Sequence, residues 1–257
     1  MKSFAGIDIG ASTTKAVIIN DKREMIGYSI TDSGADFESA ATKTYEAACA
    51  KAGCSQDDNI VVSTGYGRRN VPFANMAKTE ISCHAEGSFH FYPRAHTLID
   101  IGGQDSKVIK IDAEGKRINF KMNRKCAAGT GAFLEEIAAR LKIRMDELND
   151  LAERAQNNIQ IGSYCTVFAA TEILSRIREG VSVPEIIKGI FSSVIKRVLE
   201  MDSMEGDLAV SGGVVAHNPF LVKMFEEKVG KKIAVPPHPQ LTGAMGAALF
   251  AIKTKEV

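Results

Sequence analysis

Two cysteines lie directly before segments that are typical of helix starts. Cys126 precedes AAGTG and the apolar-periodic GAFLEEIAARLKI, and Cys165 precedes TVFAATEILSRIREG. At a helix N-terminus a thiolate gains from the helix dipole and from N–H groups that lack intrahelical partners. These residue types therefore suggest redox or metal chemistry, and burial of both thiols as small apolar side chains is the alternative.

Counting ligands suggests how these thiols could be used. An iron–sulfur cluster bound only by thiolates needs four of them. A symmetric dimer would supply four, because Cys126 and Cys165 of each subunit meet the same residues across the twofold axis. The other cysteines, Cys49, Cys54 and Cys83, are expected to be buried thiols. An odd number of cysteines, five, without a CxxC pair argues against a disulfide framework.

An internal repeat organises the chain. GIDIGASTTKAVIIND (residues 6–21) and LIDIGGQDSKVIKIDA (residues 98–113) share Ile-Asp-Ile-Gly and a lysine seven residues after the aspartate. The alternation of β-branched residues around each glycine predicts a strand, a tight turn and a second strand. The repeat therefore predicts two similar half-domains.

The segments outside the repeat add helices and strands. Helical spacing of apolar residues predicts a helix in FESAATKTYEAACAKAGC that ends at Gly53, followed by a strand in NIVVSTGYG. After the second copy come four amphipathic helix patterns and the strand-like DLAVSGGVV. The Ala/Gly-rich QLTGAMGAALFAIKTK predicts a last helix that packs closely against another backbone.

Both copies of the repeat contain residues that suit a bound polyphosphate. In DIGASTTK (residues 8–15) small residues let backbone N–H groups approach an anion, and Lys15 adds a positive charge. DIGGQD (residues 100–105) repeats the pattern, and SGGVVAHN (residues 211–218) could lie against a base or α-phosphate. The candidate nucleotide contacts are Gly10, Ser12, Thr13, Thr14, Lys15, Gly102, Gly103, Gln104, Gly129, Gly131, Gly212 and Gly213.

Three side chains are candidates for catalysis. Asp8 and Asp100 end the two predicted strands and could hold Mg²⁺ through water molecules, because this ion prefers hard oxygen ligands. Gln104 could orient the attacking water, as a glutamine does in other nucleotide hydrolases. The alternative for Gln104 is an ordinary turn residue.

Composition bears on the class of partner. Lys and Arg (32) almost balance Asp and Glu (31), so no general electrostatic field predicts binding to nucleic acid or to an anionic membrane. No stretch reaches the roughly 20 apolar residues of a membrane span, and the N-terminus has no signal-peptide pattern. A cytoplasmic protein without nucleic-acid or membrane partners is expected.

The order of these elements resembles the actin, sugar kinase and Hsp70 superfamily, with two phosphate loops, an adenosine motif and a small-residue helix. The resemblance implies an α/β, actin-like ATPase fold of two related βββαβα-type halves around a central cleft that binds Mg-ATP. The expected halves are residues 1–95, with the helix 243–257 packing back on them, and residues 96–242. Fold analogy alone does not establish what hydrolysis is used for.

A closer resemblance comes from IDIGGQDSKVI, MNRKCAAGTGAFLE, SYCTVFAATEIL and TGYGRR. These sequences are similar to the ATP-dependent activators of 2-hydroxyacyl-CoA dehydratases in the BadF/BadG/BcrA/BcrD group. The resemblance implies a homodimer that binds ATP or ADP with Mg²⁺ and shares one 4Fe–4S cluster between Cys126 and Cys165 of both subunits, as a helix-cluster-helix element.

The resemblance also implies a task, the ATP-driven transfer of one low-potential electron to an iron–sulfur dehydratase or reductase. A reduced ferredoxin or flavodoxin is the expected donor. Three alternatives remain, namely an ATPase subunit of a benzoyl-CoA reductase-like complex, a small-molecule kinase of the same fold, and a non-redox ATPase module of a larger complex.

Overall fold

The computed structural model describes residues 3–57, 59–123, 126–162 and 166–255. These residues form two compact units. The first consists of Met1–His96, Lys110–Asn119 and Gln240–Val257, and the second of Thr97–Ile109 and Phe120–Pro239. Within the described ranges, no helix has both the length and the apolar character needed to cross a membrane.

A five-stranded sheet in the order β3-β2-β1-β4-β5 is the base of the first unit. The central strand β1 pairs antiparallel with β2 and parallel with β4. The hairpin predicted for the first copy of the repeat is confirmed by β1 and β2. The strands are β1 (Ser3–Ile9), β2 (Thr13–Asn20), β3 (Met25–Asp32), β4 (Asn59–Gly65) and β5 (Met76–Ala77).

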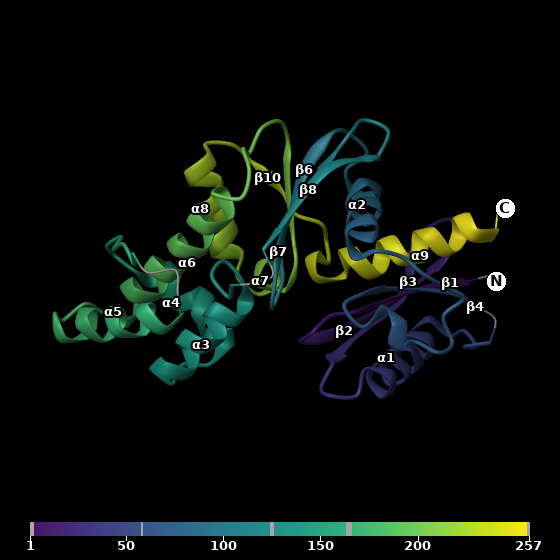
Figure 1. Cartoon of the computed structure of the whole chain (residues 1–257), viewed down its shortest axis with the longest axis horizontal. Coiled ribbons are helices and arrows are strands. Elements are labelled where there is room, and N and C mark those ends of the chain that lie inside the picture. Colours follow the sequence, from purple (N-terminus) through teal and green to yellow (C-terminus); the bar gives the residue numbers. More distant parts are fainter. Residues whose placement is uncertain (1–2, 58, 124–125, 163–165, 256–257) are drawn as a thin grey trace. The chain divides into compact units, whose positions relative to one another are not determined.

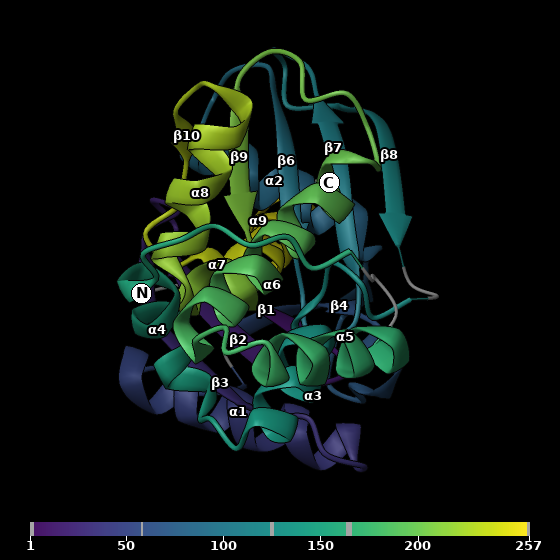
Figure 2. The same ribbon diagram turned by 90° about the vertical axis from the view of Figure 1, so that its left-hand side faces the viewer.

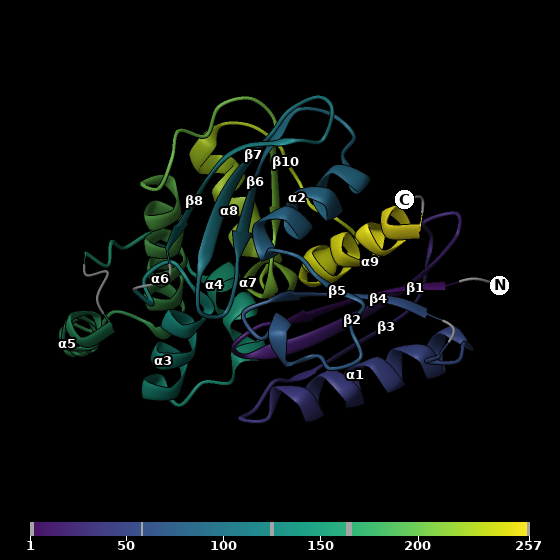
Figure 3. The same ribbon diagram turned by 45° about the vertical axis from the view of Figure 1, so that its right-hand side comes forward.

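Helices cover both faces of this first sheet. α1 (Phe37–Ala52) lies on one face and α9 (Thr242–Lys255) on the other, as Figure 3 shows. The alternation of side chains along β1 explains the arrangement, because Phe4 packs in the core cluster with α9 and the next residue, Ala5, in the cluster with α1. α2 (Glu80–Phe91) runs beside α9 (Figure 1).

The caps of α1 follow from its sequence. The Asp36 side chain accepts a hydrogen bond from the Ser39 N–H at 3.0 Å, which satisfies one N-terminal donor. Gly53, with φ of 65°, ends the helix in the left-handed conformation that favours glycine. The predicted end of this helix is therefore confirmed.

Glycines bring α2 and α9 into backbone contact. A Cβ atom on Gly246 of α9 would overlap the Cys83 carbonyl oxygen, and one on Gly87 of α2 would overlap the Thr242 carbonyl oxygen. Only residues without a side chain fit at these two positions. The close packing predicted for the Ala/Gly-rich helix is confirmed.

The second unit contains another five-stranded sheet, in the order β10-β9-β6-β7-β8. β9 pairs parallel with both β6 and β10, and Figure 2 shows β9, β6, β7 and β8 side by side. β6 and β7 are the second copy of the repeat, as predicted. The strands are β6 (His96–Ile101), β7 (Ser106–Ile111), β8 (Arg117–Asn123), β9 (Leu208–Ser211) and β10 (Ile233–Ala234).

The helices of the second unit bury one large apolar cluster. α6 is its longest helix and begins with a capping box in which the Ser182 N–H donates to the Glu185 carboxylate at 3.1 Å. Its buried face includes Ile190, Phe191 and Val194. The helices are α3 (Gly131–Leu141), α4 (Leu148–Arg154), α5 (Thr166–Arg178), α6 (Val183–Leu199), α7 (Gly213–His217) and α8 (Pro219–Val229). Single 3₁₀ turns occupy Met145–Glu147 in this unit, Arg68–Asn70 in the first unit, and Pro239–Leu241, where the chain passes from one unit to the other.

Candidate functional site

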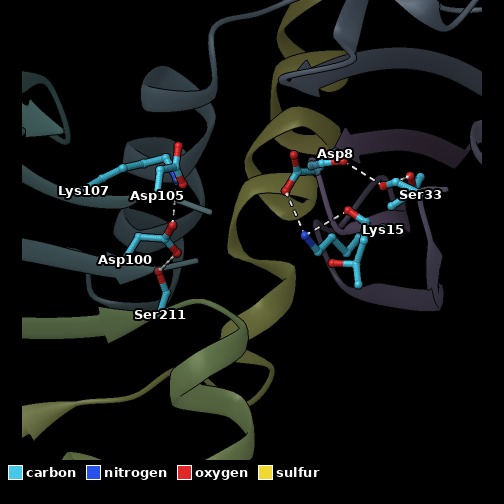
Figure 4. Close-up of polar contacts among 10 residues, drawn as sticks. Asp8, Lys15, Ser33, Asp100, Asp105, Lys107 and Ser211 are labelled. Atoms are coloured by element: carbon cyan, nitrogen blue, oxygen red, sulfur yellow. Dashed lines mark hydrogen bonds and ion pairs between the residues drawn. The ribbon is translucent and has the colours of Figure 1, made fainter. Parts of the chain in front are cut away.

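The turn between β1 and β2 is held by its own hydrogen bonds. The Gly10 N–H donates to the Thr13 carbonyl at 3.0 Å, and the Ser33 hydroxyl donates to the Gly10 carbonyl at 2.7 Å. Thr14 is fully buried, and its hydroxyl lies 2.9 Å from the Ser33 hydroxyl (Figure 4). Ser12 and Thr13 remain partly exposed at the tip of the turn. Thr14 therefore stabilises the turn through its buried hydroxyl, and the partly exposed Ser12 and Thr13 can contact a ligand.

Asp8 lies one residue before the end of β1 and is a buried carboxylate with spare bonding capacity. It is 5% exposed, and Lys15 is its ion-pair partner among the described residues, at 3.9 Å from Oδ2. The Lys15 ammonium also donates to the Thr13 carbonyl at 3.2 Å (Figure 4). A Cβ on Gly65 would overlap Oδ1 of Asp8, and one on Gly243 would lie 2.9 Å from Oδ2. The two glycines thus make room for the carboxylate.

Asp100 occupies the corresponding position one residue before the end of β6, but both of its carboxylate oxygens accept hydrogen bonds. The Lys107 ammonium donates to Oδ2 of Asp100 at 3.1 Å, and the Ser211 hydroxyl donates to Oδ1 at 2.7 Å (Figure 4). Lys107 also donates to Asp105 at 2.6 Å. The side chains of Lys107 and Asp100 are 2% and 3% exposed. The repeated lysine is therefore a buried countercharge in the second copy.

The second turn presents Gln104 to solvent. The Gly102 N–H donates to the Asp105 carbonyl at 2.9 Å, which closes the turn, while Gln104 is exposed at its tip. A solvent-facing amide at this position can donate to or accept from a water molecule.

Cys126 is exposed, and the segment after it is bonded to this second turn. The N–H groups of Gly131 and Ala132, the first two residues of α3, donate to the carbonyls of Gly102 at 2.8 Å and Gly103 at 2.7 Å. The Ser106 hydroxyl donates to the Gly129 carbonyl. The cysteine segment and the turn are consequently one hydrogen-bonded assembly.

Two further contacts define the cysteine segment. The Asn123 side-chain amide donates to the carbonyls of Cys126 at 3.1 Å and Ala128 at 2.9 Å. Gly129 has φ of 79°, a conformation that L side chains rarely adopt. Cys165, the second predicted cluster ligand, lies outside the described residues.

The third glycine cluster lies at the end of β9. Gly212 has φ of 102°, and its N–H donates to the Pro239 carbonyl at 3.0 Å. A Cβ on Gly212 would overlap the backbone of Ile101, the last residue of β6. Gly213 begins α7 directly after it. Glycine is thus needed at position 212 to bring this turn against the end of β6.

The predicted site residues form one group in each unit. Asp8 and its hairpin lie in the first unit; Asp100, Gln104, the Cys126 segment and Gly212 lie in the second. Sequence reasoning did not identify the supporting contacts of Ser33, Ser106, Asp105, Lys107 and Ser211. The repeated spacing of aspartate and lysine was a usable signal for Lys107. No local pattern indicates Ser211, which is 111 residues from its partner Asp100.

The sequence matches the BadF/BadG/BcrA/BcrD ATPase family over residues 5–251. It is 40% identical to a 2-hydroxyisocaproyl-CoA dehydratase activator of Clostridioides difficile, over 96% of this chain and 93% of the relative. It is 31% identical to one of the subunits of the benzoyl-CoA reductase of Thauera aromatica, over 97% of this chain and 93% of the relative.

Solved structures agree with these matches. The crystal structure of component A of the Acidaminococcus fermentans (R)-2-hydroxyglutaryl-CoA dehydratase is similar over the full length of both chains, with a TM-score of 0.95 and 35% identity. The activator of the 2-hydroxyisocaproyl-CoA dehydratase from Clostridium difficile, with bound ADPNP, has a TM-score of 0.91 and 38% identity over 99% of this chain and 98% of that one.

More distant structures share the fold alone. A ROK family glucokinase from Streptomyces griseus is 12% identical, with a TM-score of 0.59 over 98% of this chain and 99% of that one. The α/β, actin-like ATPase fold predicted from the sequence is confirmed by these similarities together with the two five-stranded sheets.

Proposed function

The chain belongs to the BadF/BadG/BcrA/BcrD ATPase family, and from that premise we propose that it hydrolyses ATP to activate a 2-hydroxyacyl-CoA dehydratase or a related double-cluster reductase. Activation is the transfer of one low-potential electron to the partner enzyme. The observation that carries the proposal is the pair of hydrogen bonds from Gly131 and Ala132 to Gly102 and Gly103, because it joins the Cys126 segment to a phosphate-type turn.

ATP binding is supported by the turns and by the relative that holds ADPNP. In the proposal, the backbone N–H groups of the first turn and the Lys15 ammonium bind phosphate oxygens, and the turn at Gly102 and Gly103 is a second phosphate-binding segment. Gly212 and Gly213 contact the adenosine. Gln104, whose amide is exposed, orients the water that attacks the γ-phosphorus, so that ATP and water give ADP and phosphate.

Mg²⁺ fits Asp8 better than it fits Asp100. An ion that prefers oxygen ligands and keeps several waters needs a carboxylate with unoccupied lone pairs. Lys15 is 3.9 Å from the Asp8 carboxylate, whereas both oxygens of Asp100 accept hydrogen bonds of 3.1 Å or less. Asp8 would therefore hold the ion, directly or through water, and Asp100 would fix the second turn.

A 4Fe–4S cluster fits the one thiol that the structure describes near the second turn. No group of three or more His, Cys, Asp or Glu side chains suitable for a metal occurs among the residues with described positions. Of the described cysteines Cys126 is the exposed one, and an exposed single ligand fits a cluster shared between two protomers. We propose that Cys126 and Cys165 of both protomers hold it, where it would supply a one-electron redox couple.

The proposed partners are a second copy of this chain, in a homodimer in the cytoplasm, and a reduced ferredoxin or flavodoxin as electron donor.

Similarity to the benzoyl-CoA reductase component of Thauera aromatica favours a second candidate function, an ATPase component of a related reductase complex. A kinase would require a phosphoryl acceptor, so ADP release in the absence of any acceptor argues against it.

Iron content tests the cluster. After anaerobic reconstitution, the wild-type dimer is expected to hold roughly four iron and four sulfide per dimer, with Cys126→Ser and Cys165→Ser each losing most of both. Cys54→Ser is the matched control, because Cys54 is a partly exposed thiol of the first unit and should leave the iron content unchanged. Full iron retention in Cys126→Ser would refute the assignment of Cys126 as a cluster ligand. If the wild type hydrolyses ATP but holds no cluster, only the ATPase activity of the proposed function would stand.

Ser106→Ala tests the link between nucleotide and cysteine. We expect ADPNP with Mg²⁺ to change the alkylation rate of Cys126 in the iron-free protein, and Ser106→Ala to reduce this response about 3- to 10-fold, because one buried hydrogen bond contributes about 1 kcal/mol. Ser88→Ala is the control, since this buried serine of the first unit also makes one side-chain hydrogen bond, to His96 at 2.7 Å. If ADPNP with Mg²⁺ changes the alkylation rate of Cys126 as much in Ser106→Ala as in the wild type, the hydrogen bond from Ser106 to Gly129 does not couple nucleotide binding to the cysteine.

A further inference from the structure

Two cysteines lie near Gly53, the glycine that ends α1: Cys49 is in the last turn of the helix and Cys54 directly follows the glycine. The Gly53 N–H donates to the Ala50 carbonyl at 3.4 Å, and the Cys54 N–H donates to the Cys49 carbonyl at 3.2 Å. With Gly53 at φ of 65°, these bonds make the Schellman motif, which is frequently accompanied by a contact between the two side chains at its ends, here those of Cys49 and Cys54. In most proteins that contact is between two ordinary apolar residues, and here it is between two thiols.

A single amide confirms that the two thiols are neighbours. The Asn59 side-chain nitrogen, at the start of β4, lies 3.6 Å from the Cys49 sulfur and 3.7 Å from the Cys54 sulfur. The same nitrogen donates to the Tyr45 hydroxyl and to the Ser55 carbonyl, each at 2.9 Å. Asn59 is therefore fixed in place, and both sulfurs lie against it.

The environments of the two thiols differ. Cys49 is 2% exposed, and burial, followed by the neighbouring Cys54, raises its pKa to about 12. Cys54 is partly exposed. A reagent from solvent therefore reaches Cys54, whereas Cys49 can react only with a group already attached to its neighbour.

We propose that Cys49 and Cys54 are a reversible dithiol site that closes to an intramolecular disulfide when the protein meets a small-molecule disulfide. In the first step the Cys54 sulfur attacks R–S–S–R, forming Cys54–S–S–R and releasing one RSH. In the second, the Cys49 sulfur attacks the Cys54 sulfur, forming the Cys49–Cys54 bond and releasing the second RSH. Two thiol hydrogens and two electrons pass to the reagent, so one R–S–S–R is reduced to two RSH.

Local geometry favours closure over stable mixed disulfides. Disulfides join Cα atoms roughly 4.4 to 6.8 Å apart, and the backbone hydrogen bond between Cys54 and Cys49 holds their Cα atoms close together. The new bond would fasten the last turn of α1 to the segment that enters β4. The site lies in the first unit, and the proposal does not depend on the iron–sulfur assignment.

Peptide mapping provides a direct test. The anaerobically purified protein is treated with glutathione disulfide, blocked with N-ethylmaleimide and digested with trypsin. Lys51 lies between the two cysteines, so cleavage puts Cys49 in residues 44–51 and Cys54 in residues 52–68. The expected product is these two peptides joined and two hydrogens lighter than their sum, and it disappears after treatment with excess thiol.

Two variants separate the steps. Cys49→Ser should stop at a glutathione adduct on Cys54, and Cys54→Ser should leave Cys49 as unreactive as Cys83, a fully buried thiol whose pKa burial also raises to about 12. In the wild type, we expect Cys49 to be oxidised at least about tenfold faster than Cys83. In a parallel sample stripped of iron, where no cluster binds Cys126, modification of this exposed thiol shows that the reagent is active. Separate adducts on Cys49 and Cys54, or no joined peptide while Cys126 is fully modified, would overturn the proposal.

Discussion

Replacing Lys107 with methionine is expected to lower the free energy of unfolding of the second unit by about 3 to 5 kcal/mol. The Lys107 side chain is 2% exposed, and its ammonium lies 3.1 Å from Asp100 and 2.6 Å from Asp105. Methionine keeps an unbranched side chain in the same space but removes the positive charge that Lys107 places beside the buried Asp100 carboxylate. Urea unfolding followed by circular dichroism measures the loss, and hydrogen exchange of β6 and β7 locates it.

The repeat provides the matched control, Lys15→Met. Lys15 occupies the same position in the first copy, but its side chain is 13% exposed and its ammonium is 3.9 Å from Asp8. Because Coulomb attraction weakens with distance and with exposure to water, this longer and less buried ion pair contributes less, so the control should lose less stability. Equal losses in the two variants would show that burial and distance do not distinguish these lysines.

The fold was largely predictable because its main signals are local. Alternating β-branched residues around a glycine predicted both hairpins, and apolar periodicity predicted α1 and α3. β8 was not predicted, although its sequence RINFKMN alternates polar and apolar residues, and the apolar Ile118 and Phe120 of this alternation are exposed. The partner of α9 was not predictable either, because the contact with α2 joins segments about 160 residues apart and depends on where both helices lie.

The sequence predicted which residue types form the candidate site, but it did not predict the hydrogen bonds and ion pairs that these residues make. The repeat assigned equal roles to Asp8 and Asp100, since both follow Ile and precede Ile-Gly. Their surroundings differ because Ser211, from β9, reaches Asp100 and because Lys107 approaches its aspartate more closely than Lys15 does. Such differences arise from tertiary contacts that a repeated motif does not encode.

Asp8→Asn is expected to lower the ATPase turnover number by about 100-fold, because the amide removes the negative charge that the proposal assigns to Mg²⁺ binding. Asn has nearly the same size as Asp, and the space left by Gly65 and Gly243 accommodates it. The fold should therefore lose no more than about 1 kcal/mol. Phosphate release measured across Mg²⁺ concentrations checks this: the half-saturating concentration should rise as the turnover falls.

For Asp100→Asn we expect the opposite result, a loss of folding stability without a change in Mg²⁺ dependence. Its carboxylate accepts from Lys107 at 3.1 Å and from Ser211 at 2.7 Å, and weakening charge-assisted hydrogen bonds of this kind costs about 2 kcal/mol. Phosphate release should then fall mainly with the folded fraction, and the half-saturating Mg²⁺ concentration should stay the same. If Asp100→Asn instead raised that concentration as much as Asp8→Asn, both aspartates would hold the ion, and the hydrogen bonds to Asp100 would have to rearrange when Mg-ATP binds.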